Sequence, residues 1–188
     1  IGGLSVASLL AKAGKKVLVL ERHYVIGGYT HAFQRKGYEW DVGLHYVGDV
    51  HIDGTPLNKA FRYISNDNLK WEPLDDIYDR VVFGDERFDF VRGRANFLAK
   101  LKEYFPAEKD HEAIDKYFAL LEEVRKLGIG YYAEKVIPPF LAKIFGGWLR
   151  KDVLKYSDLT TAEVLGKLTT NEKLLGVLTA QYGDYGLL

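Results

Sequence analysis

The chain begins with four patterns in a fixed order, and this order constrains its fold more than any other feature. A glycine pair, Gly2-Gly3, leads into an apolar run with small residues over 4–13, which predicts a helix that lies close to a sheet. Gly14 follows as a left-handed helix cap. Residues 17–20 are all Val or Leu, typical of a parallel strand covered on both faces, and Glu21 stands at the end of that strand.

This order predicts a nucleotide site. Glu21 follows Gly3 by 18 residues, near the offset of about 20 at which the dinucleotide-binding fold places an acid on the ribose hydroxyls. Glycine lets backbone N–H groups approach a pyrophosphate at a helix N-terminus, and a carboxylate accepts hydrogen bonds from a vicinal diol. The alternative is an ordinary βα unit whose glycines serve only tight packing.

The beginning of the sequence predicts an incomplete unit. In the fingerprint G-x-G-x-x-G, Ile1 and Gly2 would fill the two variable positions and Gly3 would be the third glycine. The first strand of the βαβ unit would then be missing, and we expect a chain truncated at both ends. A strand over 17–20 without its central neighbour would expose ladder groups and apolar surface. This piece alone is therefore expected to bind a cofactor poorly.

Composition excludes several classes of partner and site. Hydrophobic residues make up 47% of the chain and charged residues 28%, which is typical of a folded globular protein. Because 26 basic residues balance 26 acidic ones, no nucleic acid is expected as a partner. The chain has no cysteine, and the histidines at 23, 31, 51 and 111 have no ligand-like spacing with acids, so no metal is expected.

A second glycine pair, Gly27-Gly28, follows the acid and separates two kinds of nucleotide enzyme. A nicotinamide dehydrogenase does not need glycines there, whereas a flavin enzyme that runs its backbone past the bound dinucleotide does. The alternative is a simple turn between elements. Arg22 likewise either lines a cofactor or is a solvated charge.

Three segments together carry a more specific resemblance: residues 1–21, 27–33 (GGYTHAF) and 41–48 (DVGLHYVG). They resemble the N-terminal part of the carotenoid and retinoid flavin oxidoreductases, and are most similar to the retinol saturase branch of that family. Phytoene desaturases and carotenoid isomerases are relatives of this branch. Residues 181–187 (QYGDYGL) also resemble a stretch in it.

The resemblance implies an α/β fold: an FAD-binding, Rossmann-like domain over 1–55, an inserted α+β substrate region over 56–180, and the start of a further segment over 181–188. It implies no catalytic residue. His45 is either an interior histidine or a group near the flavin or substrate. The cofactor-binding residues implied are Gly2, Gly3, Glu21, Arg22, Gly27, Gly28, Thr30 and Gly43.

The implied reaction is hydride transfer between FAD and a C=C bond of a hydrophobic polyene of the retinol or carotenoid type, with NAD or NADP as candidate electron donor. Alternatives within the fold are a carotenoid desaturase or isomerase and an amine oxidase. An alternative from another class is a non-catalytic lipid- or membrane-binding module with a degenerate nucleotide fold. The expected location is the cytoplasm, or the cytoplasmic face of a membrane.

Local signals predict the elements of the remaining chain. Pro56 begins a short helix to Ile64, which 66–68 end, and a hairpin of the three-residue kind joins 78–83 to 87–91. Helices are predicted over 94–105 and 110–127, the second with an apolar stripe that is expected to be core. Further on, Thr160 and Glu163 predict a capping box, and Asn171 caps a last helix.

Residues 128–150 are rich in aromatic and aliphatic side chains edged by Lys and Arg. This composition suits an interfacial membrane segment, because tyrosine and tryptophan favour the headgroup level. The alternative is a lid or helix pair packed on the other domain. Tyr182 and Tyr185 either line an apolar substrate channel or serve packing.

Overall fold

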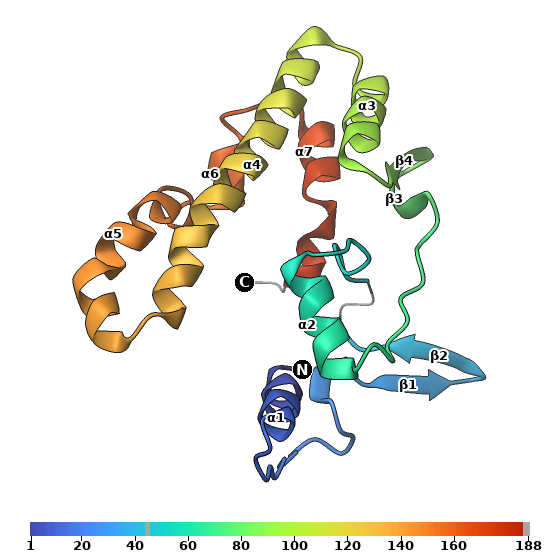
Figure 1. The fold of residues 1–188 in the computed structure, drawn as a ribbon. Coiled ribbons are helices and arrows are strands. Elements are labelled where there is room, and N and C mark those ends of the chain that lie inside the picture. The colour runs from blue at the N-terminus through green and yellow to red at the C-terminus, as the bar shows by residue number, and fades with distance from the viewer. Residues whose placement is uncertain (44–45, 186–188) are drawn as a thin grey trace. The chain divides into compact units, whose positions relative to one another are not determined.

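The computed structural model describes residues 1–43 and 46–185, which form a mixed structure of helices and antiparallel strands (Figure 1). The chain divides into two compact units, residues 1–73 and 74–188. The described strands form two sheets of two strands each, β1-β2 and β3-β4. By its contacts the helix that follows residue 55 belongs to the first unit. The functional boundary predicted between 55 and 56 stays a prediction.

Helix α1, Gly2–Lys12, begins the first unit where the sequence predicts a helix. Gly14 follows its end with a φ of 74°, so the predicted left-handed cap is confirmed. The N–H of Gly14 donates to the carbonyl of Ala11 at 2.9 Å, and that of Lys15 donates to Leu10 at 3.0 Å. These two bonds are the Schellman pattern, which satisfies carbonyls that the helix leaves without partners.

The strand predicted over 17–20 does not form. These residues belong to no ladder in the described part of the chain, and Leu18 and Leu20 are 82% and 85% exposed. The reason is that a strand needs a partner. The strands described next along the sequence pair with each other instead. The segment thus exposes apolar surface, as expected for a strand without its neighbour.

A hairpin that the sequence analysis missed follows the second glycine pair. Strands β1, Ala32–Arg35, and β2, Tyr38–Asp41, pair antiparallel, with Arg35 opposite Tyr38. The two turn residues, Lys36 and Gly37, have φ values of 53° and 81°. Positive φ at both central positions is the type I′ turn, whose twist matches that of the paired strands.

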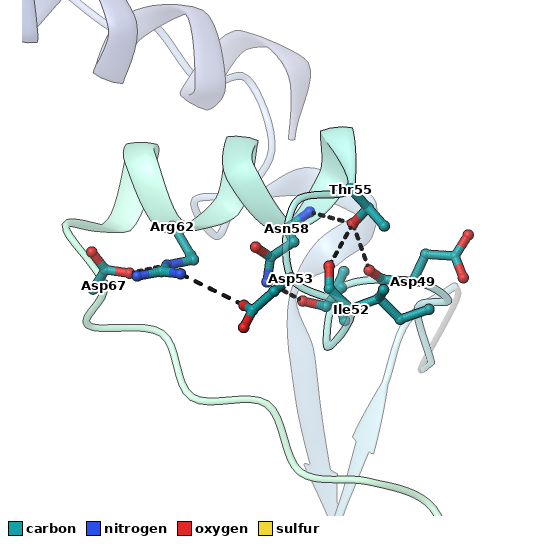
Figure 2. Close-up of polar contacts among 8 residues, drawn as sticks. Asp49, Ile52, Asp53, Thr55, Asn58, Arg62 and Asp67 are labelled. Carbon is teal, nitrogen blue, oxygen red and sulfur yellow. Dashed lines mark hydrogen bonds and ion pairs between the residues drawn. The ribbon is translucent and has the colours of Figure 1, made fainter.

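Helix α2, Pro56–Ser65, confirms the predicted start at proline and stop at Asn66, which has a φ of 53°. Thr55 caps it by accepting from the N–H of Asn58 at 3.3 Å (Figure 2). The side-chain amide of Asn58 is buried and donates to the carbonyl of Val50 at 2.8 Å. The loop before the helix is therefore held to its first turn.

Helices α1 and α2 contact each other through few groups. The hydroxyl of Ser8 donates to the carbonyl of Ile64 at 3.1 Å, and the ammonium of Lys12 lies 4.7 Å from the centre of the Tyr63 ring. Val50 is the one hydrophobic residue below 9% exposure among the described residues of this unit. The first unit thus has almost no core of its own.

The second unit begins with the predicted hairpin. Strands β3, Ile77–Phe83, and β4, Glu86–Val91, pair antiparallel, but Phe83 pairs directly with Glu86. The loop therefore has two residues, and the prediction of a three-residue loop is wrong by one. Gly84 has a φ of 59°, which lets the chain reverse within two residues.

The core of the second unit lies between β4 and the helices that follow it. Helix α3 spans Arg94–Tyr104, close to the prediction. The rings of Phe88 and Phe105 are stacked with their centres 5.5 Å apart. The buried members of this core are Phe88, Phe90, Leu101, Phe105, Ala113, Ile114, Phe118, Leu174 and Val177.

Helix α4, Glu108–Val136, is longer than predicted and runs antiparallel to α5, Pro139–Ser157 (Figure 1). Glycines explain why the predicted helix ends too early and why α4 and α5 pack closely. A Cβ at Gly130 would lie 2.7 Å from the backbone oxygen of Leu149, and one at Gly146 would lie 2.7 Å from Oε1 of Glu134. Residues that weaken a helix prediction thus let two helices approach closely.

The segment 128–150 comprises the end of α4 and the first part of α5, which form a helix pair. Packing on the other domain and contact with a membrane both stay predictions for it. The guanidinium of Arg150 donates to Glu134 at 2.6 Å across the pair. Within residues 1–43 and 46–185, no helix combines the length and apolar character needed to cross a bilayer.

Short helices complete the second unit. Helix α6, Thr161–Leu165, has the predicted capping box between Thr160 and Glu163, and α7, Glu172–Leu178, has the predicted cap at Asn171. The 3₁₀ helix η2 follows over Ala180–Tyr185.

The stripe on α4 is core only in its first half. Ile114 and Phe118 are buried as predicted, whereas Leu121 is 47% exposed. Three members of the stripe, Tyr117, Leu121 and Val124, line a hollow, and Tyr117 also packs against the core.

Candidate cofactor-binding loop

The loop between Glu21 and His31 brings together several of the predicted cofactor residues. The carboxylate of Glu21 accepts a hydrogen bond from the backbone N–H of His23 at 2.8 Å. That bond does most to lower the pKa of Glu21. Burial opposes it, and the backbone N–H groups of Arg22 and Gly27 lower the pKa further.

Glu21 is therefore an ionised acceptor at neutral pH. Its side chain is exposed, so its remaining lone pairs can accept from a ligand. An ionised carboxylate is a strong acceptor for the two hydroxyls of a vicinal diol. The influence of the Gly27 N–H also places the acid beside the glycine pair, so two separate sequence predictions meet in one loop.

Glycine at position 27 is required by the backbone and by its neighbour. Its φ is 110°, a region that side chains disfavour, and a Cβ there would lie 3.0 Å from Oγ1 of Thr30. The same hydroxyl donates to the carbonyl of Gly27 at 2.8 Å. Gly27 and Thr30 thus form a closed turn around the one-turn 3₁₀ helix η1, Gly28–Thr30.

Gly43 lies beside this turn. Its φ is 82°, and a Cβ on it would lie 3.2 Å from the carbonyl oxygen of Tyr29. The hairpin brings it there, because the N–H of Val42 donates to the carbonyl of His31 at 3.1 Å. The hairpin thus returns the chain to the loop at Gly43. Its role with a cofactor stays a prediction.

Three further predicted residues lie apart from this turn. Gly2 and Gly3 form the first turn of α1, where no side chain caps the helix. A Cβ on either would meet no atom within 4 Å in the described part of the chain. Arg22 is exposed, which suits both of its alternative roles. His45 lies outside the described residues.

Sequence reasoning missed a ring cluster that supports the loop. The hydroxyl of Tyr24 lies 2.9 Å from Nε2 of His31, and Nδ1 of His31 lies 2.5 Å from the carbonyl oxygen of Gly28. Because that carbonyl can only accept, Nδ1 carries the proton and Nε2 accepts from Tyr24. The ring centres of His23 and His31 are 4.8 Å apart. Residues eight apart give no local signal of such a contact.

The loop and the start of α1 fit the chemistry of a dinucleotide. Glu21 offers an ionised acceptor for ribose, and Gly27 and Gly43 keep side chains away from the backbone that a ligand would approach. The uncapped first turn of α1 leaves N–H groups directed at solvent, which suits a pyrophosphate. Within the described residues, no three His, Asp or Glu side chains form a group that could hold a metal ion.

Comparison with known proteins gives consistent relatives. The chain is 37% identical to zebrafish (Danio rerio) all-trans-retinol 13,14-reductase over 99% of its length and 32% of that protein. It is 34% identical to the human protein of that name over 99% of the chain and 31% of that protein. It is also 51% identical to prolycopene isomerase 1 of an Oncidium hybrid cultivar, over 96% of the chain and 31% of that protein.

The chain thus spans about a third of the length of these curated relatives. No solved structure matches it at a significant level. The model of one family, flavin containing amine oxidoreductase, matches residues 1–178. The predicted kinship with retinoid and carotenoid oxidoreductases is therefore confirmed, and the chain belongs to the flavin containing amine oxidoreductase family, whose cofactor is FAD.

Proposed function

We propose that this chain forms part of an oxidoreductase that acts on C=C bonds of a hydrophobic polyene, of the retinol or carotenoid type, by hydride transfer. One observation carries the proposal: relatives named as retinol reductases and as a prolycopene isomerase match nearly the whole chain. Bound FAD supplies the flavin ring that accepts or donates the hydride. Because the chain spans about a third of its relatives, the activity belongs to the proposal.

The residues of the first unit then have distinct roles. Glu21 accepts from the adenosine ribose, and the first turn of α1 at Gly2-Gly3 donates N–H groups to the phosphates. Gly27 and Gly43 keep the loop open, and the hydroxyl of Thr30 fixes the carbonyl of Gly27. Arg22 adds positive charge near the phosphates. None of these groups makes or breaks a bond in the reaction. Their loss should therefore weaken cofactor binding and not slow the chemical step itself.

A titration with FAD tests the cofactor roles in a chimera in which this chain replaces the matching third of zebrafish all-trans-retinol 13,14-reductase, because the chain alone is expected to bind cofactor poorly. The matched pair is Glu21→Gln and Glu39→Gln, since Glu39 is an exposed acid in the same unit. Glu21→Gln removes a charge-assisted acceptor and should weaken FAD binding about tenfold. Glu39→Gln should change it less than about twofold. Equal affinities for the two variants would contradict the assignment of Glu21.

The reaction itself is tested in the same chimera. Retinol, a carotene and an amine are each supplied with reduced and with oxidised flavin, and NADH and NADPH are compared as electron donors. A saturated polyene supports reduction. New double bonds, an isomer or an aldehyde would assign desaturation, isomerisation or amine oxidation instead.

A non-catalytic lipid-binding module is the rival from another class. One relative supports this rival. A zebrafish protein named inactive all-trans-retinol 13,14-reductase is 32% identical over 97% of the chain. The absorption spectrum of the chimera separates the two. A yellow protein that turns over polyene supports the enzyme, whereas a colourless protein that still binds polyene supports the module.

We also propose that the protein binds peripherally to a membrane surface that faces the cytoplasm. Residues 128–150 make this contact. The α4-α5 pair exposes large apolar side chains, with Val136 83% and Trp148 67% exposed. Lys135 and Lys143 lie on the same segment. Aromatic rings beside cations suit the interface of a bilayer.

Liposome flotation tests the membrane contact. Phe145→Ser with Trp148→Ser should abolish most flotation, because burial of large apolar side chains supplies most of the binding energy. The matched control is Tyr38→Ser with Trp40→Ser, which removes exposed aromatics from β1-β2. Full flotation of the Phe145/Trp148 variant would remove the membrane proposal.

A further inference from the structure

The second unit contains a hollow with a volume of about 660 Å³ that none of the cofactor residues touches. Its walls come from the middle of α4, the end of α5, α6, the end of α7 and η2. This volume lies within the range of about 300–1,000 Å³ that is usual for small-molecule sites. Its apolar walls include Leu120, Leu121, Val124, Val164, Leu165 and Leu178.

The lining carries no ionisable charge at neutral pH. In the described part of the chain, no Lys, Arg, Asp, Glu or His lines the hollow, although charged residues make up 28% of the sequence. The polar lining consists of hydroxyls and an amide, such as Thr161, Thr179 and Gln181. Because a buried charge without a partner is costly, these walls select an uncharged ligand.

The walls are held by contacts that do not depend on a ligand. The hydroxyl of Tyr156 donates to Glu123 at 2.8 Å and ties the end of α5 to α4. The capping box of Thr160 and Glu163 fixes the start of α6. The hydroxyl of Thr179 donates to the carbonyl of Leu175 at 2.8 Å, so its oxygen can still accept. The hollow is therefore largely preformed.

The hollow also leaves apolar surface in water. Leu121 continues the core stripe of α4 yet is 47% exposed, and Tyr182 is 63% exposed at η2. Transfer of such surface from water is favourable by about 25 cal/mol per Å². An apolar ligand would therefore gain from contacts that the protein does not make by itself.

We propose that this hollow binds an elongated, uncharged apolar molecule that ends in a hydroxyl or carbonyl group. Its chain lies along Leu121 and Val124, and its polar end meets the hydroxyls and amide of the lining. The site discriminates against a carboxylate of the same length, because no cation in the lining compensates the charge. Only the identification of the natural ligand as a polyene alcohol rests on the proposed function.

Displacement of the neutral dye Nile red from the full 188-residue chain tests the site. We expect 1-dodecanol to displace the dye at concentrations at least about tenfold lower than dodecanoate, because the acid would bury an unpaired charge. Leu121→Glu should weaken dodecanol about tenfold. Leu121→Arg should weaken dodecanol and strengthen dodecanoate, since it supplies the missing cation.

The matched controls are Ile129→Glu and Ile129→Arg, on the same helix and 66% exposed but outside the lining. Both should leave displacement within about twofold of the unchanged chain. Circular dichroism identifies a variant that fails to fold. For that case, a photoreactive alkyl alcohol is cross-linked to the unchanged chain and is expected to label 117–124 and 156–182.

Equal displacement by dodecanol and dodecanoate, loss in the Ile129 variants alone, or labelling confined to 1–73 would each overturn the proposal. None of these measurements requires FAD. If the chain binds dodecanol while the chimera takes up no flavin, this site is supported and the proposed function is contradicted.

Discussion

The two units of the chain differ in what holds them together. The second unit buries nine residues of β4 and its helices in one cluster, whereas the first buries Val50 and Asn58 among its described residues. In the first unit, hydrogen bonds of loops and caps take the place of a core, as at Thr55 and Thr30.

Because of this difference, the two candidate sites are held in shape by different kinds of contact. The candidate cofactor loop lies in the unit with little core, so its shape depends on glycines and short-range hydrogen bonds. The hollow lies in the unit with a core, where packed helices hold its walls. Because local stability tends to be low where binding loops lie, we expect the first unit to be the less stable of the two.

The largest expected contrast between the units is in hydrogen exchange. Backbone amides of 17–20 have no ladder partner among the described residues and should exchange at nearly unprotected rates. Amides near Ile114, in the core of the second unit, should exchange at least about 1,000-fold more slowly, because they open only with the unit. Mass spectrometry of peptides measures both. Equal protection of the amides of 17–20 and of those near Ile114 would contradict the difference in stability between the two units.

Truncation of an apolar side chain should follow the same contrast. Leu174 is fully buried, so Leu174→Ala should lower the free energy of unfolding by about 2–5 kcal/mol. Leu18→Ala removes the same atoms from an exposed position and should change it by less than about 0.5 kcal/mol. Urea denaturation followed by circular dichroism measures the difference. A costly Leu18→Ala would reveal a core in the first unit.

Two glycines of the helix pair should respond in opposite directions. Gly130→Ala places a methyl group 2.7 Å from the backbone oxygen of Leu149 and should cost about 1–3 kcal/mol, because the helices must separate. A Cβ at Gly147 meets nothing within 4 Å, so Gly147→Ala should stabilise the helix by up to about 1 kcal/mol. Thermal unfolding compares them. The same sign for both would contradict close approach at Gly130.

The smallest effect concerns two acids whose pKa values are lowered for different reasons. Arg125, with help from Lys126, lowers the pKa of Glu122 to about 2, whereas backbone N–H groups, chiefly that of His23, lower that of Glu21. Salt screens side-chain charges at the surface. Carbon NMR titration in 1 M NaCl should therefore raise the pKa of Glu122 more than that of Glu21.

The lowered pKa of Glu122 also sets a direction for stability. Its folded pKa lies below the ordinary value of 4.5, so its contribution is present above pH 4.5 and is lost as the pH falls toward about 2. Glu122→Gln should flatten the pH dependence of unfolding in this window. An unchanged pH dependence in Glu122→Gln would contradict this account.

Local signals predicted the local structure well. Pro56 and Asn66 bound α2, and Thr160, Glu163 and Asn171 cap helices as expected. Each of these predictions rests on hydrogen bonds that close within a few residues, so the sequence contains all of their partners.

Errors arise where a partner lies far along the sequence. The strand predicted over 17–20 needs a neighbouring strand to form. The helix α4 was predicted too short because Gly130, which weakens a helix prediction, lies where α4 closely approaches Leu149 of α5. Leu121 follows the apolar period of a core helix and yet lines a hollow.

The candidate site was predicted in part. Glu21 and Gly27 follow from residue type and spacing, whereas Thr30 and Gly43 were implied by the family resemblance. Glu21, Gly27 and Thr30 lie in one loop, and Gly43 lies beside it. The contact of Tyr24 with His31 could not be predicted, because it depends on the path of the chain around the glycine pair.

Gly27 and Gly28 differ in which substitutions their backbone conformations tolerate. A single-nucleotide change in a glycine codon can give aspartate. At Gly28, with a φ of 56° and no atom within 4 Å of a Cβ, this residue fits the left-handed region. At Gly27, a φ of 110° and the hydroxyl of Thr30 leave no room for it. Random mutagenesis should therefore recover replacements at Gly28 and almost none at Gly27.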